Sequence, residues 1–193
     1  MKKFLAILVL GLFLITPSQA DDSRDFQIEG MSIGDSLLDY FSEEEILENL
    51  PYSEWKKKKF NLFEFNSSER FEDYDAIQIS FKRKDKKYII YSIEGLMNFQ
   101  DNIDNCIKKM KEIDLELSKM FKNLEKEEFG FAKLRQDKSG KSKYTTTMYY
   151  FSNEDRIGTQ CYDWSKEIKG IDHLRVLMRK KEYSKWLISD DPY

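Results

Sequence analysis

The chain has 193 residues, of which 40% are hydrophobic and 35% charged, and its formal net charge at pH 7 is −3. This length suits one domain with a sizeable core, and the mildly acidic balance gives no case for a nucleic-acid partner. The low content of glycine and proline, eight and three residues, argues against a low-complexity or disordered chain.

The first twenty residues predict a secretory signal peptide. Lys2 and Lys3 precede a hydrophobic run from residue 4 to 15, which is too short for a comfortable membrane span. Small residues at positions 18 and 20 then precede a cleavage point, and no cysteine follows the run to carry a lipid anchor. We expect cleavage after Ala20, which leaves residues 21–193 as a single α+β domain, periplasmic or extracellular.

In chain order, the pattern predicts short helices, three strands, a long helix and three or four further strands. A turn at residues 30–35 leads into a first short helix, and the capping-box sequence at 42–45 predicts a second that runs to Leu50. Alternating or continuous apolar runs predict strands at 60–65, 76–82, 88–93, 129–134, 144–151, 157–164 and 173–179. Because hairpins dominate, we expect a largely antiparallel sheet in an α+β fold.

The strongest pattern runs from Asp101 to about Leu124. Its apolar residues recur at steps of three or four, as expected for an amphipathic helix, with Asp101 as the N-cap. We expect one long helix (about 101–124), packed across a face of the sheet.

The chain has two cysteines, Cys106 in this helical stripe and Cys161 in a strand-like run. Two buried thiols are one interpretation. In an oxidising compartment we instead predict a disulfide between them, which would pin the long helix to the second hairpin.

Two stretches, residues 25–38 (DFQIEGMSIGDSLL) and 91–95 (YSIEG), resemble small exported proteins of unknown function from marine alphaproteobacteria of the Pelagibacter type. This resemblance covers most of the mature chain and implies no activity. Gly30-Met31-Ser32, opening a helix, is similar to the start of the small outer-membrane assembly lipoproteins of the BamE type, although this chain is longer and lacks their lipid-bearing cysteine.

The sequence offers no candidate catalytic, metal or cofactor residue. His173 is the only histidine, and a lone histidine is not a zinc site. No sequence motif supplies a nucleophile for it, and no P-loop, dinucleotide fingerprint or nucleophile elbow is present. An enzyme without a recognisable motif remains an alternative.

Two surfaces are candidates for binding. The hairpin 144–164 is rich in aromatic residues that cannot all face one core, so either another element covers them, which we favour, or they form a binding face with Tyr149, Tyr162, Trp164 and the neighbouring Arg175. The basic run Lys56, Lys57, Lys58 and Lys59 indicates either contact with an anionic membrane surface or, as we favour, a solvated approach to an edge strand.

From these features we expect an exported, non-enzymatic protein that binds an envelope partner through a sheet face or edge. The alternative is a periplasmic enzyme or small-ligand carrier. A concave pocket with converging polar groups would favour the alternative, whereas a flat aromatic patch or a bare strand edge would favour partner binding.

Overall fold

The computed structural model describes residues 22–50, 59–66, 70–71, 73–168 and 170–189. Within these residues, seven strands form one antiparallel sheet in the order β1-β2-β3-β7-β6-β5-β4. The strands are β1 (Phe60–Phe65), β2 (Ala76–Lys82), β3 (Ile90–Asn98), β4 (Glu125–Lys133), β5 (Lys143–Tyr150), β6 (Arg156–Asp163) and β7 (His173–Arg179). The α+β class and the largely antiparallel sheet predicted from the sequence are confirmed. The expected signal peptide, residues 1–20, lies outside the described residues.

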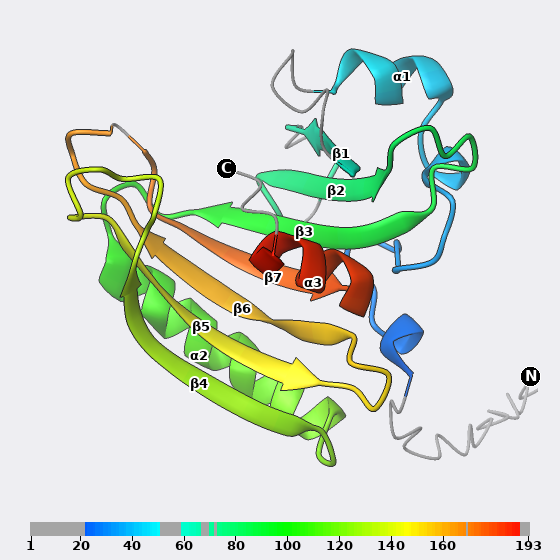
Figure 1. Ribbon diagram of the computed structural model, residues 1–193. Coiled ribbons are helices and arrows are strands. Elements are labelled where there is room, and N and C mark those ends of the chain that lie inside the picture. Colours follow the sequence, from blue (N-terminus) through cyan, green and yellow to red (C-terminus); the bar gives the residue numbers. More distant parts are fainter. Residues whose placement is uncertain (1–21, 51–58, 67–69, 72, 169, 190–193) are drawn as a thin grey trace, which may run out of the picture.

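The helices are α1 (Glu43–Glu48), α2 (Ile103–Met120) and α3 (Lys181–Ser189), and two 3-10 turns lie at Ser23–Asp25 and Leu37–Asp39. Figure 1 shows α2 and α3 on opposite sides of the sheet. Among the helices of the described segments, none has both the length and the hydrophobicity needed to cross a bilayer.

The connection from β3 to β4 determines the topology. Strands β1 to β3 follow one another from one edge to the middle of the sheet, and the chain then passes through α2 to the opposite edge. Strands β4 to β7 return from that edge until β7 pairs with β3. At about 1.5 Å per residue, α2 is about 27 Å long, enough to cross the strands between the middle and that edge.

Helix α2 turns Cys106, Met110 and Leu117 towards the sheet, where it contacts β6 and β7. Its N-cap is Asn102, whose side chain accepts a hydrogen bond from the Asn105 amide. The expected cap, Asp101, has a φ of 58° and therefore lies outside the extended region that an N-cap residue adopts. At the other end Phe121 leaves helical geometry, so the helix ends before the expected Leu124.

The main core lies on the face of the sheet that α2 covers. A row of fully buried apolar side chains crosses the central strands in register, from Ile79 through Ile93 and Met178 to Ile157. Helix α2 covers the β6 and β7 part of this face, and apolar residues of the N-terminal segment 28–46 complete the same cluster. This arrangement leaves the opposite face of the sheet to other elements.

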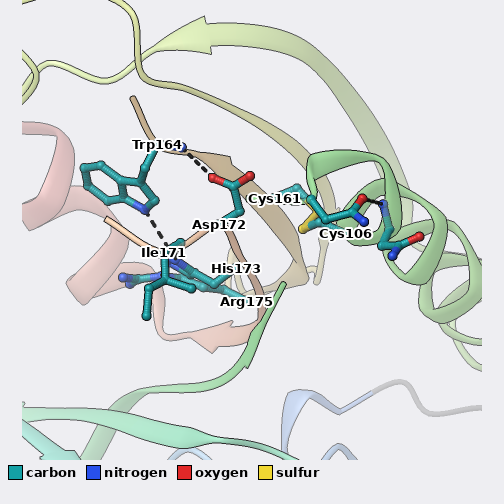
Figure 2. Close-up of a disulfide and its surroundings, with 9 residues drawn as sticks. Cys106, Cys161, Trp164, Ile171, Asp172, His173 and Arg175 are labelled. Atoms are coloured by element: carbon teal, nitrogen blue, oxygen red, sulfur yellow. Dashed lines mark hydrogen bonds between the residues drawn. A yellow bond between two sulfur atoms is a disulfide. The ribbon is translucent and has the colours of Figure 1, made fainter. Parts of the chain in front are cut away.

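The predicted disulfide between Cys106 and Cys161 is present, with an S–S distance of 2.10 Å (Figure 2). Both residues are fully buried, and the bond joins α2 to β6. The disulfide thus fixes the helix to the strand that it covers.

On the opposite face, α3 covers the part of the sheet nearest β1. Tyr183 and Trp186 pack against Phe60 of β1, and Tyr91 of β3 lies beside them. Ser80 of β2 donates a hydrogen bond to the Tyr183 hydroxyl. Tyr183 and Trp186 of α3 therefore pack on the β1 side of the sheet, away from the aromatic hairpin of β5 and β6.

Candidate functional site

A buried group of three charges lies at the centre of the face opposite α2. Glu94 of β3 pairs in register with Leu177 of β7, so Arg175 and Arg179, two residues to either side of Leu177, point to the same face as the Glu94 carboxylate. Nη1 of Arg175 lies 2.9 Å from Oε2 of Glu94, and Nη2 of Arg179 lies 2.7 Å from Oε1. We call these three residues the charge triad.

The charge triad carries a net positive charge at neutral pH. Burial alone would raise the pKa of Glu94, but the charges of Arg179 and Arg175 outweigh it and lower this pKa to about 2. Burial alone would lower the pKa of Arg179, but the Glu94 carboxylate outweighs it and raises that pKa. Two guanidinium groups therefore face a single carboxylate below the surface.

His173 lies beside this triad and is held in its neutral form. Its Nε2 accepts a hydrogen bond from Nε of Arg175 at 3.1 Å, and its Nδ1 lies 2.8 Å from the Ile171 carbonyl oxygen, to which it donates (Figure 2). This tautomer follows from the two bonds. Burial and the charge of Arg175 lower the pKa of His173 to about 4. The one lone pair of the ring is thus engaged by Arg175, and it is poorly placed to act as a base at neutral pH.

Trp164 completes the surroundings of His173. Its backbone N–H donates to Oδ1 of Asp172 at 2.8 Å, and its Nε1 lies 3.3 Å from Nδ1 of His173 (Figure 2). Because that nitrogen carries a hydrogen for Ile171, the 3.3 Å contact is not a second hydrogen bond to it. The indole also lies against Gly170, where a Cβ would come within 2.5 Å of Cγ of Trp164. Only glycine permits this close approach.

An aromatic stack extends from this point across the neighbouring strands. The Tyr162 ring lies 4.7 Å from the His173 ring at an angle of 12°, and 5.6 Å from the Tyr144 ring at 18°. The Tyr162 hydroxyl donates to Oε1 of Gln160 at 3.1 Å. Tyr144, Gln160 and Tyr162 therefore line a continuous surface on β5 and β6.

A pocket of about 270 Å³ opens on this surface, between the end of β4 and α3. Its cationic lining residues are Lys133, Arg135 and Arg179, and the residues of the described part that line it include no carboxylate. Tyr144, Tyr162 and Leu187 supply aromatic and aliphatic walls. The pocket is concave, partly apolar and positively charged, and we call it the cationic pocket.

The structure divides the binding face that the sequence suggested. Tyr162, Trp164 and Arg175 lie together around His173. Tyr149 lies on the opposite face, where it is buried and its hydroxyl donates to Oδ1 of Asp114 in α2 at 2.7 Å. The reason is the register, because Tyr149 pairs with Ile157 on the α2 side. A surface made of all four residues is therefore not formed, and the binding role of the other three stays a prediction.

Sequence reasoning missed Glu94 and Arg179. Glu94 follows a nearly continuous apolar strand, and a carboxylate at such a position needs a partner if it is buried. Arg175 and Arg179 are four residues apart on one strand, so they share a face. These two signals could have indicated the triad, but the pairing of β3 with β7 comes only from the fold.

The basic run lies largely beyond the described residues, since Lys56, Lys57 and Lys58 are outside them. Lys59 is described, and its Nζ lies 2.9 Å from Oε1 of Glu182 in α3. This pair is consistent with a structural use of Lys59 beside the edge strand β1.

The other edge strand, β4, is exposed along its whole length of nine residues. Phe129 and Phe131 are 47% and 52% exposed, which is unusual for aromatic side chains in a strand. In the sheet as described, β5 is the neighbour of β4 and no strand follows on its far side.

Within the described segments, no group of three or more His, Cys, Asp or Glu side chains could hold a metal ion. No protein-family model, curated protein or solved structure matches this chain. The function therefore has to be inferred from the geometry of the chain's own residues.

Proposed function

We propose that this chain is an exported, non-enzymatic binding protein of the cell envelope, and that its ligand binds in the cationic pocket. The observation that carries the proposal is the convergence of Lys133, Arg135 and Arg179 on one concave, partly aromatic surface. A concave pocket with a few converging polar groups is the usual form of a ligand site. In this proposal, one long amphipathic helix covers one face of the sheet, and the ligand binds on the other face, beside α3.

The state of the neighbouring titratable groups supports binding rather than catalysis. His173 is neutral, and Arg175 engages the lone pair that a general base would use. Glu94 is kept ionised by two arginines, so it has no proton to donate near neutral pH. These groups are suited to holding the pocket wall in place.

A second candidate function is the capture of an envelope protein by strand addition at β4. It is favoured by the complete exposure of β4 and by the exposed Phe129 and Phe131. Against it stand the charged residues of β4 and the irregular register between Phe129 and Ala132, because both features hinder edge-to-edge pairing. We therefore place this function second.

The test is native mass spectrometry of the purified protein after incubation with a small-molecule extract of the cells that produce it. Leu187→Trp fills the cationic pocket, and Leu115→Trp adds the same bulk at an exposed position of α2. We expect a bound small molecule in the wild type and in Leu115→Trp, and none in Leu187→Trp. Retention of the same ligand by Leu187→Trp would contradict the proposal.

The β4 candidate is tested in parallel with Phe129→Ser combined with Phe131→Ser. Strand addition at β4 requires that this variant lose an envelope protein that both the wild type and Leu187→Trp retain. Loss of a small molecule in Leu187→Trp alone instead supports the cationic pocket.

A further inference from the structure

The charge around the cationic pocket is not balanced by its surroundings. The charge triad contributes one net positive charge. Lys133 and Arg135 are exposed, and neither forms an ion pair with another residue of the described segments. An anion that enters the pocket therefore meets a positive potential, with no competing carboxylate among the lining residues that the structure describes.

A further arginine, Arg156, lies beside Arg179 but outside the lining of the cationic pocket. Arg156 of β6 pairs in register with Arg179 of β7, so both arginines lie on the same face of adjacent strands. Nε of Arg156 is buried and has no hydrogen-bond partner in the part of the chain that the structure describes.

The shape and the walls of the pocket restrict the rest of the ligand. Tyr144 and Tyr162 are nearly parallel, with ring centroids 5.6 Å apart, and Leu187 lines the same space. Such walls favour a flat or short apolar group. The volume of about 270 Å³ is near the lower limit for ligand pockets, so the ligand is a small molecule or a small part of a larger one.

We propose that the cationic pocket binds a small amphiphilic anion. Its charged group, a phosphate, sulfonate or carboxylate, lies beside Lys133, Arg135 and Arg179, and its apolar part lies against Tyr144 and Tyr162. This inference rests on the proposed function in one respect, namely that a ligand occupies this pocket. It adds the chemical class of that ligand.

The experiment uses phenyl phosphate as the probe, with benzyl alcohol as a neutral comparator and inorganic phosphate as a comparator without an apolar part. Amide NMR titrations of the disulfide-bonded mature protein give the site and the dissociation constant. We expect saturable binding of phenyl phosphate, with shifts concentrated on residues 133–136, 144 and 162. Both comparators should bind at least about tenfold more weakly, because benzyl alcohol lacks the anionic group and inorganic phosphate lacks the apolar part.

Matched variants separate local contacts from overall charge. Lys133→Gln with Arg135→Gln should weaken phenyl phosphate binding about tenfold, because the two cations nearest the opening are lost. Lys119→Gln with Lys122→Gln removes the same charge at the end of α2 and should leave the affinity unchanged. The thermal midpoint of each variant checks that it is folded.

Three outcomes would overturn this inference. They are equal binding of benzyl alcohol and phenyl phosphate, an equal loss of affinity in the two charge variants, and the absence of saturable phenyl phosphate binding at the pocket up to millimolar concentration. In each case the proposed function is decided separately, by whether Leu187→Trp loses the ligand found by native mass spectrometry. The chemical class and the location of the site can therefore fail independently.

Discussion

Nη2 of Arg179 lies 2.7 Å from Oε1 of Glu94, across the pairing of β7 with β3 at the middle of the sheet. The two residues are 85 positions apart in the chain. One belongs to the strands β1–β3 and the other to the strands β4–β7, and these two groups meet at this pairing. Arg175 binds the second oxygen of the same carboxylate. The charge triad therefore ties β1–β3 to β4–β7, and its Arg179 also lines the cationic pocket.

The first prediction concerns Glu94→Gln. This change leaves two guanidinium groups facing a neutral amide in a buried position, so we expect a loss of about 3–5 kcal/mol in the free energy of unfolding. Urea denaturation of the disulfide-bonded protein measures it. Glu128→Gln is the control, because it breaks the Lys126–Glu128 pair, in which Glu128 is 69% exposed, and should cost less than about 1 kcal/mol. Similar small losses for both variants would show that the triad contributes little.

The second prediction is a dependence of stability on pH that comes from His173. Its pKa is lowered from 6.5 to about 4 in the folded protein, so the unfolded chain binds a proton more readily. The stability is therefore complete above about pH 6.5 and falls as the pH decreases to about 4, by about 3 kcal/mol in total.

Urea denaturation at a series of pH values measures this dependence. His173→Phe keeps a flat ring next to Tyr162 but does not titrate, so the decrease between about pH 6.5 and 4.5 should disappear. Protonation of Glu94 also lowers the stability, but at lower pH, between about 4.5 and about 2, and both proteins should show this loss. An unchanged slope above pH 4.5 in His173→Phe would exclude His173 as its source.

The third prediction concerns the disulfide. Cys106 and Cys161 are 55 positions apart, and for a loop of this length the chain-entropy model gives about 4 kcal/mol of stabilisation. We expect reduction to lower the free energy of unfolding by about this amount, as measured in urea with and without a reductant. The variant Cys106→Ala with Cys161→Ala should show the lower stability under both conditions. A midpoint that reduction does not shift in the wild type would refute the prediction.

The fourth prediction concerns the contact between β5 and β6 at Gly158, which pairs with Met148. A Cβ at Gly158 would lie 2.1 Å from the backbone oxygen of Thr147, and the backbone of a paired strand cannot move aside easily. We therefore expect Gly158→Ala to cost about 1–3 kcal/mol or more in unfolding free energy. Gly130→Ala in β4 is the matched control, because a Cβ there meets nothing within 4 Å. Equal stabilities of the two variants would mean that the strands can separate at no cost.

Hydrophobic periodicity in the sequence was enough to predict the antiparallel α+β class, and the compartment argument was enough to predict the Cys106–Cys161 bond. Neighbouring side chains of one strand point in opposite directions, which is why the aromatic residues of the hairpin 144–164 could not all face one core. These are local properties, or properties of a single pair of residues, and they can be read along the chain.

Only the tertiary structure decided that Tyr149 packs under α2, that Glu94 meets two arginines, and that Lys133 and Arg135 join Arg179 at one pocket. Each of these contacts depends on which strand lies next to which and in what register. Strand order and register arise from pairing between residues far apart in sequence and from the burial of whole faces, so no local pattern specifies them.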